Sequence, residues 1–380
     1  MQLIRVLRPT AMAAVVCLGW VVNAAAQTEL DDDMFHSLVR VFTDSKNIAV
    51  RSLMGDYTVP LPNQIGLSLH VNNEQVTIPG VSAPAGSQEA IDAITTASRP
   101  ISGNAFQDYV KVRNEVQGEL ARGPAAVSLY LSSEQDYLAH QIAGRYGRDF
   151  KNQQLNVTVG TSYGWDDIKP LADDDTQTGD ATKTTMHLDA VATRVLSPTT
   201  MVRFGLEYNL VEGLQHNPYR NVYAGGAIVP ERHPDHRQRQ DAFVKVNQYL
   251  PNRSSLKFSY RFYNDDWGID SHELGGKLSQ YITQGFYARY EYRYYTQTAA
   301  DFYRDEYVSV NGIDGYRSGD YRMDALSSHL FGFGINADLA TLAATVPVMS
   351  RMGAWLSYER YFNSNNYSAD ILETGLDFRF

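Results

Sequence analysis

The stretch Leu372-Glu373-Thr374-Gly375-Leu376-Asp377-Phe378-Arg379-Phe380 alternates apolar and polar side chains. Successive residues of an extended strand point to opposite faces. The leucines and phenylalanines of this stretch therefore share one face, and its charged residues share the other. The pattern predicts an amphipathic strand whose last residue is aromatic.

The same alternation recurs along the chain, separated by turn residues. Further segments that follow it lie around residues 354–359, 331–338, 289–295, 256–263, 202–208, 155–159 and 65–71. Repeated alternation of this kind is the signature of a transmembrane β-barrel, in which only alternate residues face lipid. No segment after residue 26 approaches the roughly 20 consecutive apolar residues of a membrane helix. We therefore expect an all-β fold, a transmembrane antiparallel up-and-down β-barrel.

The connections give an independent test of this fold. Short ones at 122–124, 151–153, 197–199, 251–253 and 282–284 alternate with longer polar ones near 81–107, 166–183, 214–237 and 299–321. This alternation is expected when the long loops face outside and the tight turns face the periplasm. The C-terminus then lies in the periplasm, which requires an even number of strands. Two candidate strands at 37–42 and 48–59 bring the count to sixteen, and fourteen is the alternative. Residues 339–350 form a longer connection on the periplasmic side, where we expect a short helix.

The N-terminal region predicts export. Arg5 and Arg8 precede an apolar run, and Ala24-Ala25-Ala26 supplies small residues for cleavage. We expect residues 1–26 to be a signal peptide, 27–35 a periplasmic tail and 36–380 the barrel. The C-terminal aromatic strand resembles the signal by which Gram-negative bacteria insert such barrels. It implies outer-membrane localisation, contact with lipid and lipopolysaccharide, and recognition of Phe380 by the barrel-assembly machinery.

Composition narrows the function classes. The net charge of −10 argues against a nucleic-acid partner, which calls for a basic stripe. Cys17, inside the predicted signal peptide, is the only cysteine, so the exported chain has no disulfide or thiolate ligand. The 25 tyrosines suit a barrel, because tyrosine is favoured at membrane interfaces. We expect no cofactor.

Charged residues on the strands predict the lining of the lumen, because they alternate with the apolar positions. The candidates are Arg113, Glu115, Arg145, Arg203, Glu207, Lys257, Arg261, Arg289, Glu291, Arg293, Glu359 and Glu373. Basic and acidic walls would orient a polar solute or ion. The competing interpretation is a salt-bridged, partly hydrated interior. The sequence leaves both open, because it does not place these residues around the circumference.

The long loops hold the remaining candidates. Residues 84–100, with Glu89, Asp92 and Arg99, are candidates for a constriction loop or for an outside lid. Two weaker candidates are metal sites. His233-Pro234-Asp235-His236 places two imidazoles near a carboxylate. The acidic segment 264–270, with Asp265 and Asp266, offers oxygen ligands, although turns prefer the same residues.

Several motifs resemble a family of proteobacterial outer-membrane β-barrels catalogued as a domain of unknown function. They include the segments at 90–98, 132–137, 260–268, 294–303, 318–322 and 358–361, of which the run around Asp265-Asp266-Trp267 is specific. The resemblance implies the barrel and supplies no catalytic residue. Members of the family tend to be encoded beside thioredoxin-like and flavin-transfer proteins, which implies a link to envelope redox systems.

The function expected from these observations is a conduit through the outer membrane. It is either a narrow channel for solutes and ions, or a sheath for a periplasmic or extracellular protein such as a redox partner. We expect no enzymatic activity. The alternatives are an enzyme at the rim that uses His233 or His236, and a barrel whose long loops bind external ligands.

Overall fold

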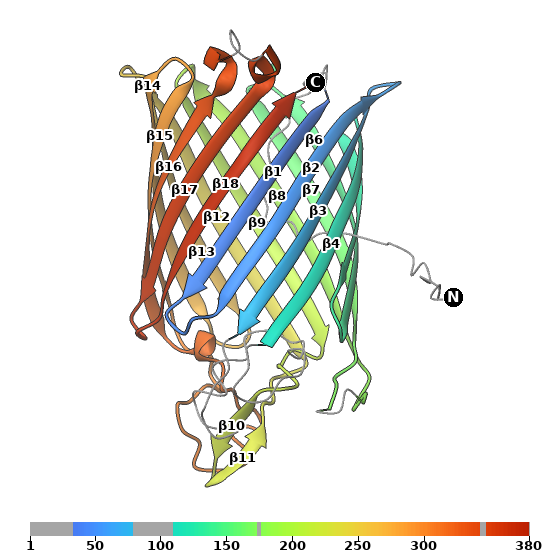
Figure 1. Ribbon diagram of the computed structural model, residues 1–380. Helices are drawn as coiled ribbons and strands as arrows, with labels where there is room; N and C mark the ends of the chain where they lie inside the picture. The colour runs from blue at the N-terminus through green and yellow to red at the C-terminus, as the bar shows by residue number, and fades with distance from the viewer. Residues whose placement is uncertain (1–32, 79–108, 173–175, 343–346, 380) are drawn as a thin grey trace, which may run out of the picture.

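The computed structural model describes residues 33–78, 109–172, 176–342 and 347–379. In these residues sixteen antiparallel strands form one closed barrel, and a two-stranded hairpin stands at one end (Figure 1). The predicted fold class is therefore confirmed. The count of sixteen is also confirmed, because both candidate strands near the N-terminus exist and β1 closes the ring against β18.

The wall strands in chain order are β1 (Met34–Asp44), β2 (Ala49–Leu61), β3 (Ile65–Ile78), β4 (Tyr109–Arg122), β5 (Ala125–Ser133), β6 (Tyr137–Phe150), β7 (Leu155–Ile168), β8 (Ala181–Ser197), β9 (Thr200–Gly213), β12 (His236–Leu250), β13 (Ser254–Asp265), β14 (Asp270–Thr283), β15 (Phe286–Gln297), β16 (Leu326–Asp338), β17 (Met352–Asn363) and β18 (Ser368–Arg379). The hairpin consists of β10 (Asn221–Ala224) and β11 (Ala227–Pro230), inserted between β9 and β12. The described residues also include three short 3-10 helices: η1 (Tyr321–Met323), η2 (Leu339–Leu342) and η3 (Pro347–Arg351).

The two ends of the barrel differ. At the upper end in Figure 1, here called the turn end, most strands are joined by tight turns. Left-handed backbone angles at Gly123, Lys151, Asn152 and Arg253 make these turns at predicted positions. The longer connection at this end carries η2 and η3, the helical structure expected there. The opposite end, here called the loop end, carries the hairpin and the long connections.

Large apolar side chains cover the outside of the barrel. Phe258, Phe331 and Leu129 are 51%, 51% and 58% exposed, although they lie in the middle of strands. They alternate with inward-facing polar residues, as the sequence pattern predicts. In the described part of the chain, no helix is long and apolar enough to cross a membrane. A barrel of sixteen strands is wide enough to enclose an aqueous channel.

Candidate functional site

The inner face of the barrel carries the charged residues predicted for the lumen. All twelve lie on wall strands, in the alternate set opposite the exposed apolar residues. On β13, for example, Lys257 and Arg261 alternate with the outward-facing Phe258 and Phe262, which are 51% and 37% exposed. The alternation thus determines which side chains meet inside, while the closed strand order places them around the circumference.

Many of these residues form ion pairs inside the barrel, within a strand, with a neighbouring strand or with the next strand but one. Arg113 lies 3.0 Å from Glu74 and 3.1 Å from Glu115. Arg145 lies 2.6 Å from Glu119, and Arg261 lies 2.6 Å from Asp241 and 4.0 Å from Glu207. The remaining pairs are Glu291 with Lys277 at 2.6 Å, Arg293 with Glu273 at 3.8 Å and Glu373 with Arg40 at 2.6 Å.

A group of basic residues on β12, β13 and β15 differs from these pairs. Among the described residues, Lys245, Lys257 and Arg289 have no carboxylate within 4.0 Å. Lys257 also stands directly opposite Lys277 in the strand register. Like charges placed opposite each other destabilise a sheet unless water screens them. Their arrangement therefore favours a hydrated lumen over a dry, fully salt-bridged one.

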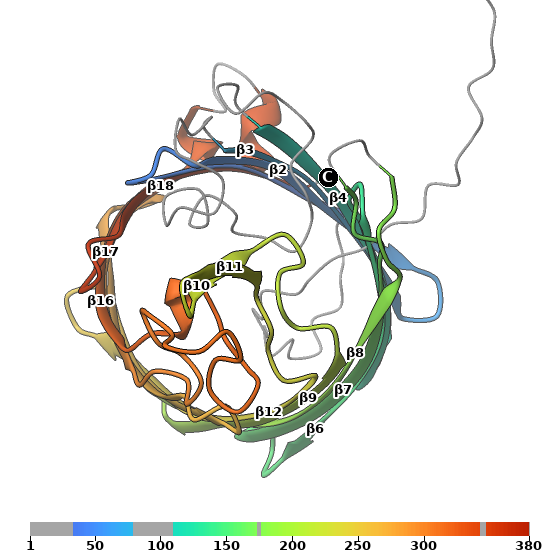
Figure 2. The same cartoon turned by 90° about the horizontal axis from the view of Figure 1, so that it is seen from below.

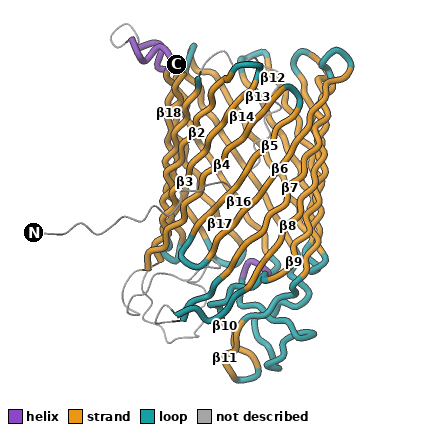
Figure 3. Tube along the Cα trace, turned by 90° about the vertical axis from the view of Figure 1, so that its right-hand side faces the viewer, coloured by secondary structure: helices purple, strands orange, loops and turns teal. Residues whose placement is uncertain are grey.

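The loop end carries a second structure, here called the cap, made of residues 214–235, 266–269 and 298–325. Seen along the barrel axis, the hairpin and the 298–325 segment extend over one side of the opening (Figure 2). From the side, the hairpin projects beyond the ends of the strands (Figure 3). The cap is thus a folded body that lies at the loop end, just beyond the ends of the wall strands.

The cap has its own apolar core. Trp267, Ile269, Ala300 and Phe302 form a buried cluster, in which Trp267 is 3% exposed. The hairpin joins it through a second cluster around Ala224 and Tyr307, because Ile313 packs against both.

The β13–β14 turn anchors this core. The backbone amide of Asp301 donates to the carbonyl of Trp267 over 2.9 Å. Gly268 has a φ of +85°, and a β-carbon there would lie 2.4 Å from the Asp301 carboxylate. The specific Asp265-Asp266-Trp267-Gly268 motif therefore attaches the cap core to the β13–β14 turn of the wall.

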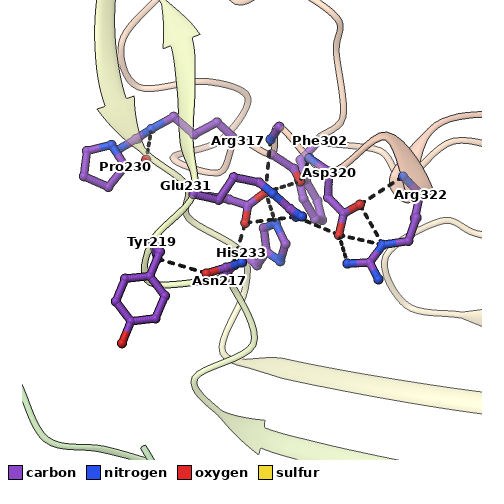
Figure 4. A network of polar contacts seen from close by, with 12 residues as sticks. Asn217, Tyr219, Pro230, Glu231, His233, Phe302, Arg317, Asp320 and Arg322 are labelled. Atoms are coloured by element: carbon purple, nitrogen blue, oxygen red, sulfur yellow. Dashed lines mark hydrogen bonds and ion pairs between the residues drawn. The ribbon is translucent and has the colours of Figure 1, made fainter. Parts of the chain in front are cut away.

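A buried polar network joins the two long segments of the cap (Figure 4). The side chain of Glu231 is 0% exposed and accepts hydrogen bonds from the Ser318 hydroxyl over 2.6 Å and the Gly319 amide over 3.0 Å. Arg220 lies 2.8 Å from Asp320 and 3.7 Å from Glu231. Arg322 donates from Nε and Nη2 to Asp320 over 2.6–3.1 Å. This network ties residues 217–231 to residues 318–322.

Electrostatics hold the network in its charged form. Burial alone would raise the pKa of Glu231, but His233 and Arg220 hold that pKa below its ordinary value. Burial likewise opposes ionisation of Asp320, yet Arg322 and Arg220 hold its pKa well below the ordinary range. Burial lowers the pKa of His216, and the neighbouring His233 lowers it further. Both carboxylates are therefore ionised at neutral pH, and the His216 imidazole is uncharged.

A cavity of about 300 Å³ lies between the cap and the wall strands. The cap supplies Arg220, Glu231, His233 and Asp320 to its lining, among others. Lys183, Arg237 and Arg239 line it from β8 and β12. Polar groups from wall and cap therefore converge on one hollow at the loop end of the barrel.

The two predicted metal-binding histidines have different partners, and only His236 lies near another predicted candidate, Asp266. His233 is buried beside Glu231, at 3.3 Å, whereas His236 lies near Glu212 and Asp266, at 3.9 and 3.7 Å. Asp265 accepts from the guanidinium of Arg237 and from the amides of Trp267 and Ile269, so it organises the turn. Within the described residues no group of three or more potential ligands could hold a metal ion. The predicted constriction residues Glu89, Asp92 and Arg99 lie outside the described residues.

The sequence interpretation missed most of the cap network and the cavity. Arg220, Glu231, Ser318 and Asp320 lie in long polar loops, where no periodicity separates buried from solvated positions. One signal was available in Gly225-Gly226, between Asn221–Ala224 and Ala227–Pro230. Paired glycines with positive φ, here 57° and 82°, between short apolar strands predict a tight hairpin.

Solved structures with a similar fold come from outer-membrane proteins. The siderophore receptor PirA of Acinetobacter baumannii is 12% identical, and the match covers 86% of this chain and 52% of that one, with a TM-score of 0.45. A loop L8 deletion mutant of OmpT, an outer membrane protein of Vibrio cholerae, is 10% identical, with coverage of 92% and 99% and a TM-score of 0.42. OccK9 of Pseudomonas aeruginosa is 8% identical, with coverage of 92% and 98% and a TM-score of 0.43. The chain spans about half the length of the siderophore receptor, and at these scores no functional argument rests on any of the three.

Sequence comparison gives the family. No curated protein matches the chain. A family model described as a protein of unknown function, DUF3570, matches residues 10–346, which is most of the chain. The resemblance drawn from the motifs is thereby confirmed, and the chain belongs to the DUF3570 family of proteins of unknown function.

Proposed function

We propose that this protein is a conduit through the outer membrane for small polar solutes or ions, with the cap narrowing its external mouth. The observation that carries the proposal is the closed ring of sixteen strands with charged, partly solvated side chains inside. Arg261 is 49% exposed and Arg145 39% exposed, although both face inward. A packed interior would bury such groups.

The lumen supports a channel for solutes more directly than a sheath for a partner protein. The core of a protein–protein interface is depleted of lysine and carboxylate side chains. The inner face instead carries alternating charges and the basic residues Lys245, Lys257 and Arg289. A sheath would be indicated if an envelope protein co-purified with the barrel and closed its conductance.

We also propose how the chain reaches the membrane. The signal peptide directs export, and the last strand is recognised by the assembly machinery, with the loop end then facing outward. In support, β18 pairs with β1 at the seam of the barrel and presents Leu372 and Leu376 outward, 46% and 45% exposed. Phe380 lies outside the described residues. Replacing Phe380 with serine tests this step, with loss of the heat-modifiable barrel from outer-membrane fractions as the expected result.

Liposome swelling tests the conduit. Proteoliposomes that contain the refolded barrel are expected to swell in solutions of small sugars and amino acids, and not in large dextrans. Deletion of residues 84–100, the candidate constriction loop, is expected to speed swelling. Absence of swelling with every small solute would contradict the conduit.

A further inference from the structure

The cavity beneath the cap has an excess of positive charge. Its lining includes five basic residues, Lys183, Arg220, Arg237, Arg239 and Arg322, and two acidic ones, Glu231 and Asp320. Two more carboxylates pair with it from outside the lining, Asp166 with Lys183 at 2.9 Å and Asp265 with Arg237. Among the described residues, five positive charges therefore face four negative ones, before either lining histidine is protonated.

The excess charge resides on Arg239. The four other basic residues each have a carboxylate within 4.0 Å, whereas Arg239 has none among the described residues. Its buried Nε atom also has no hydrogen-bond partner there. A guanidinium nitrogen that is buried without an acceptor is costly. Arg239 thus contributes to the cavity lining a guanidinium that has no ion-pair partner among the described residues.

The surroundings of Arg239 suit a compact oxyanion. Lys183 lines the same cavity from β8, and the uncharged imidazole of His216 lines it from the cap. Guanidinium groups bind carboxylate and phosphate oxygens in a bidentate manner, and an ammonium adds a point charge. A volume of about 300 Å³ suits a small molecule and excludes a folded partner.

We propose that this cavity binds a small polyvalent oxyanion, of the phosphate or polycarboxylate class, through Arg239 and Lys183. If this oxyanion is the solute that enters the conduit, that part of the proposal rests on the proposed function. Binding itself requires no transport. It is measured in detergent, so a failed binding experiment and a failed transport experiment are separate results.

Trp267 supplies an internal probe, because it lines the cavity and the Arg237 guanidinium lies 4.0 Å from its ring centroid. With Trp165 and Trp355 replaced by phenylalanine, the purified barrel is titrated with inorganic phosphate and with citrate, against chloride at equal ionic strength. We expect saturable fluorescence changes with phosphate, citrate or both, and none with chloride. Isothermal titration calorimetry of the unmodified chain provides the second readout.

Arg239→Gln is expected to weaken binding about tenfold or more, because a charged hydrogen bond is lost. Arg239→Lys is expected to retain part of the affinity. Arg232→Gln is the matched control, since Arg232 is an exposed cap arginine outside the lining. Protease resistance of residues 298–325 verifies that each variant keeps its cap. No saturable binding by the unmodified chain, or equal binding by a folded Arg239→Gln variant, would overturn the proposal.

Discussion

The barrel wall and the cap contain the same kinds of charged residue in two different environments. On the wall, Arg145 and Arg261 point into the lumen and remain 39% and 49% exposed. In the cap, Glu231 and Arg220 are 0% and 3% exposed and lie 3.7 Å apart as an ion pair. Water can replace a lost partner of the partly exposed wall groups, whereas the buried cap groups depend on their protein partners. We therefore expect the same substitution to have small effects in one region and large effects in the other.

The largest effect is expected from Trp267→Ala, which removes the centre of the cap core. Truncating a buried tryptophan costs about 3–5 kcal/mol. The cap should open locally while the barrel persists, because β1 still closes the ring against β18. The expected result is rapid proteolysis within residues 298–325, with the heat-modifiable barrel retained on gels. Trp165→Ala is the matched control on the outer surface, where Trp165 is 41% exposed, and it should leave the cap protected.

The same change from glutamate to glutamine, made once in the cap and once in the barrel wall, compares the two environments directly. Glu231→Gln removes the buried carboxylate beside His233 and leaves Arg220 with Asp320 as its only carboxylate partner among the described residues, at a cost of about 3 kcal/mol to the cap. Glu373→Gln removes a carboxylate from a lumen pair whose Arg40 partner is 41% exposed, at a cost of about 0–1 kcal/mol. Hydrogen exchange of the cap and urea unfolding of the barrel measure the two costs. Equal costs would contradict the difference in environment.

Acidification should open the cap before it affects the barrel. The pKa values of Glu231 and Asp320 are held below their ordinary values of 4.5 and 3.8. A depressed pKa adds stability above the unfolded-state pKa, and this is lost as pH falls through the folded one. The cap should therefore remain closed at neutral pH and loosen only below about pH 4. The measurement is fluorescence of Trp267 against pH, with Glu231→Gln expected to flatten the transition. A transition near pH 6–7 would point to histidines instead.

The smallest effect on stability is expected from Arg145→Gln. Its pair with Glu119 is partly exposed, so the cost should be about 0–1 kcal/mol in urea unfolding. The loss of a lumen charge should instead appear in transport, as a shift of the reversal potential toward cation selectivity. An unchanged reversal potential would remove Arg145 from the solute path.

The wall was predictable from the sequence and the cap was not. On a strand, burial follows from period two, so Phe258 outside implies Lys257 inside. The strand count depended on recognising residues 48–59 as a strand, which β2 confirms. No such period operates in residues 214–235 and 298–325, whose fold arises from contacts between distant segments such as Glu231 with Ser318. His233 was singled out for its neighbour His236, whereas in the structure it lies beside Glu231.

Single-channel conductance of the refolded barrel in planar bilayers tests the central claim most directly, with Trp267→Ala measured beside the unmodified chain. A hydrated lumen narrowed by a folded cap predicts steady, ion-selective steps for the unmodified chain and larger steps for the variant. Silence from both proteins would contradict an open lumen, and steps of equal size would contradict a cap that narrows the mouth.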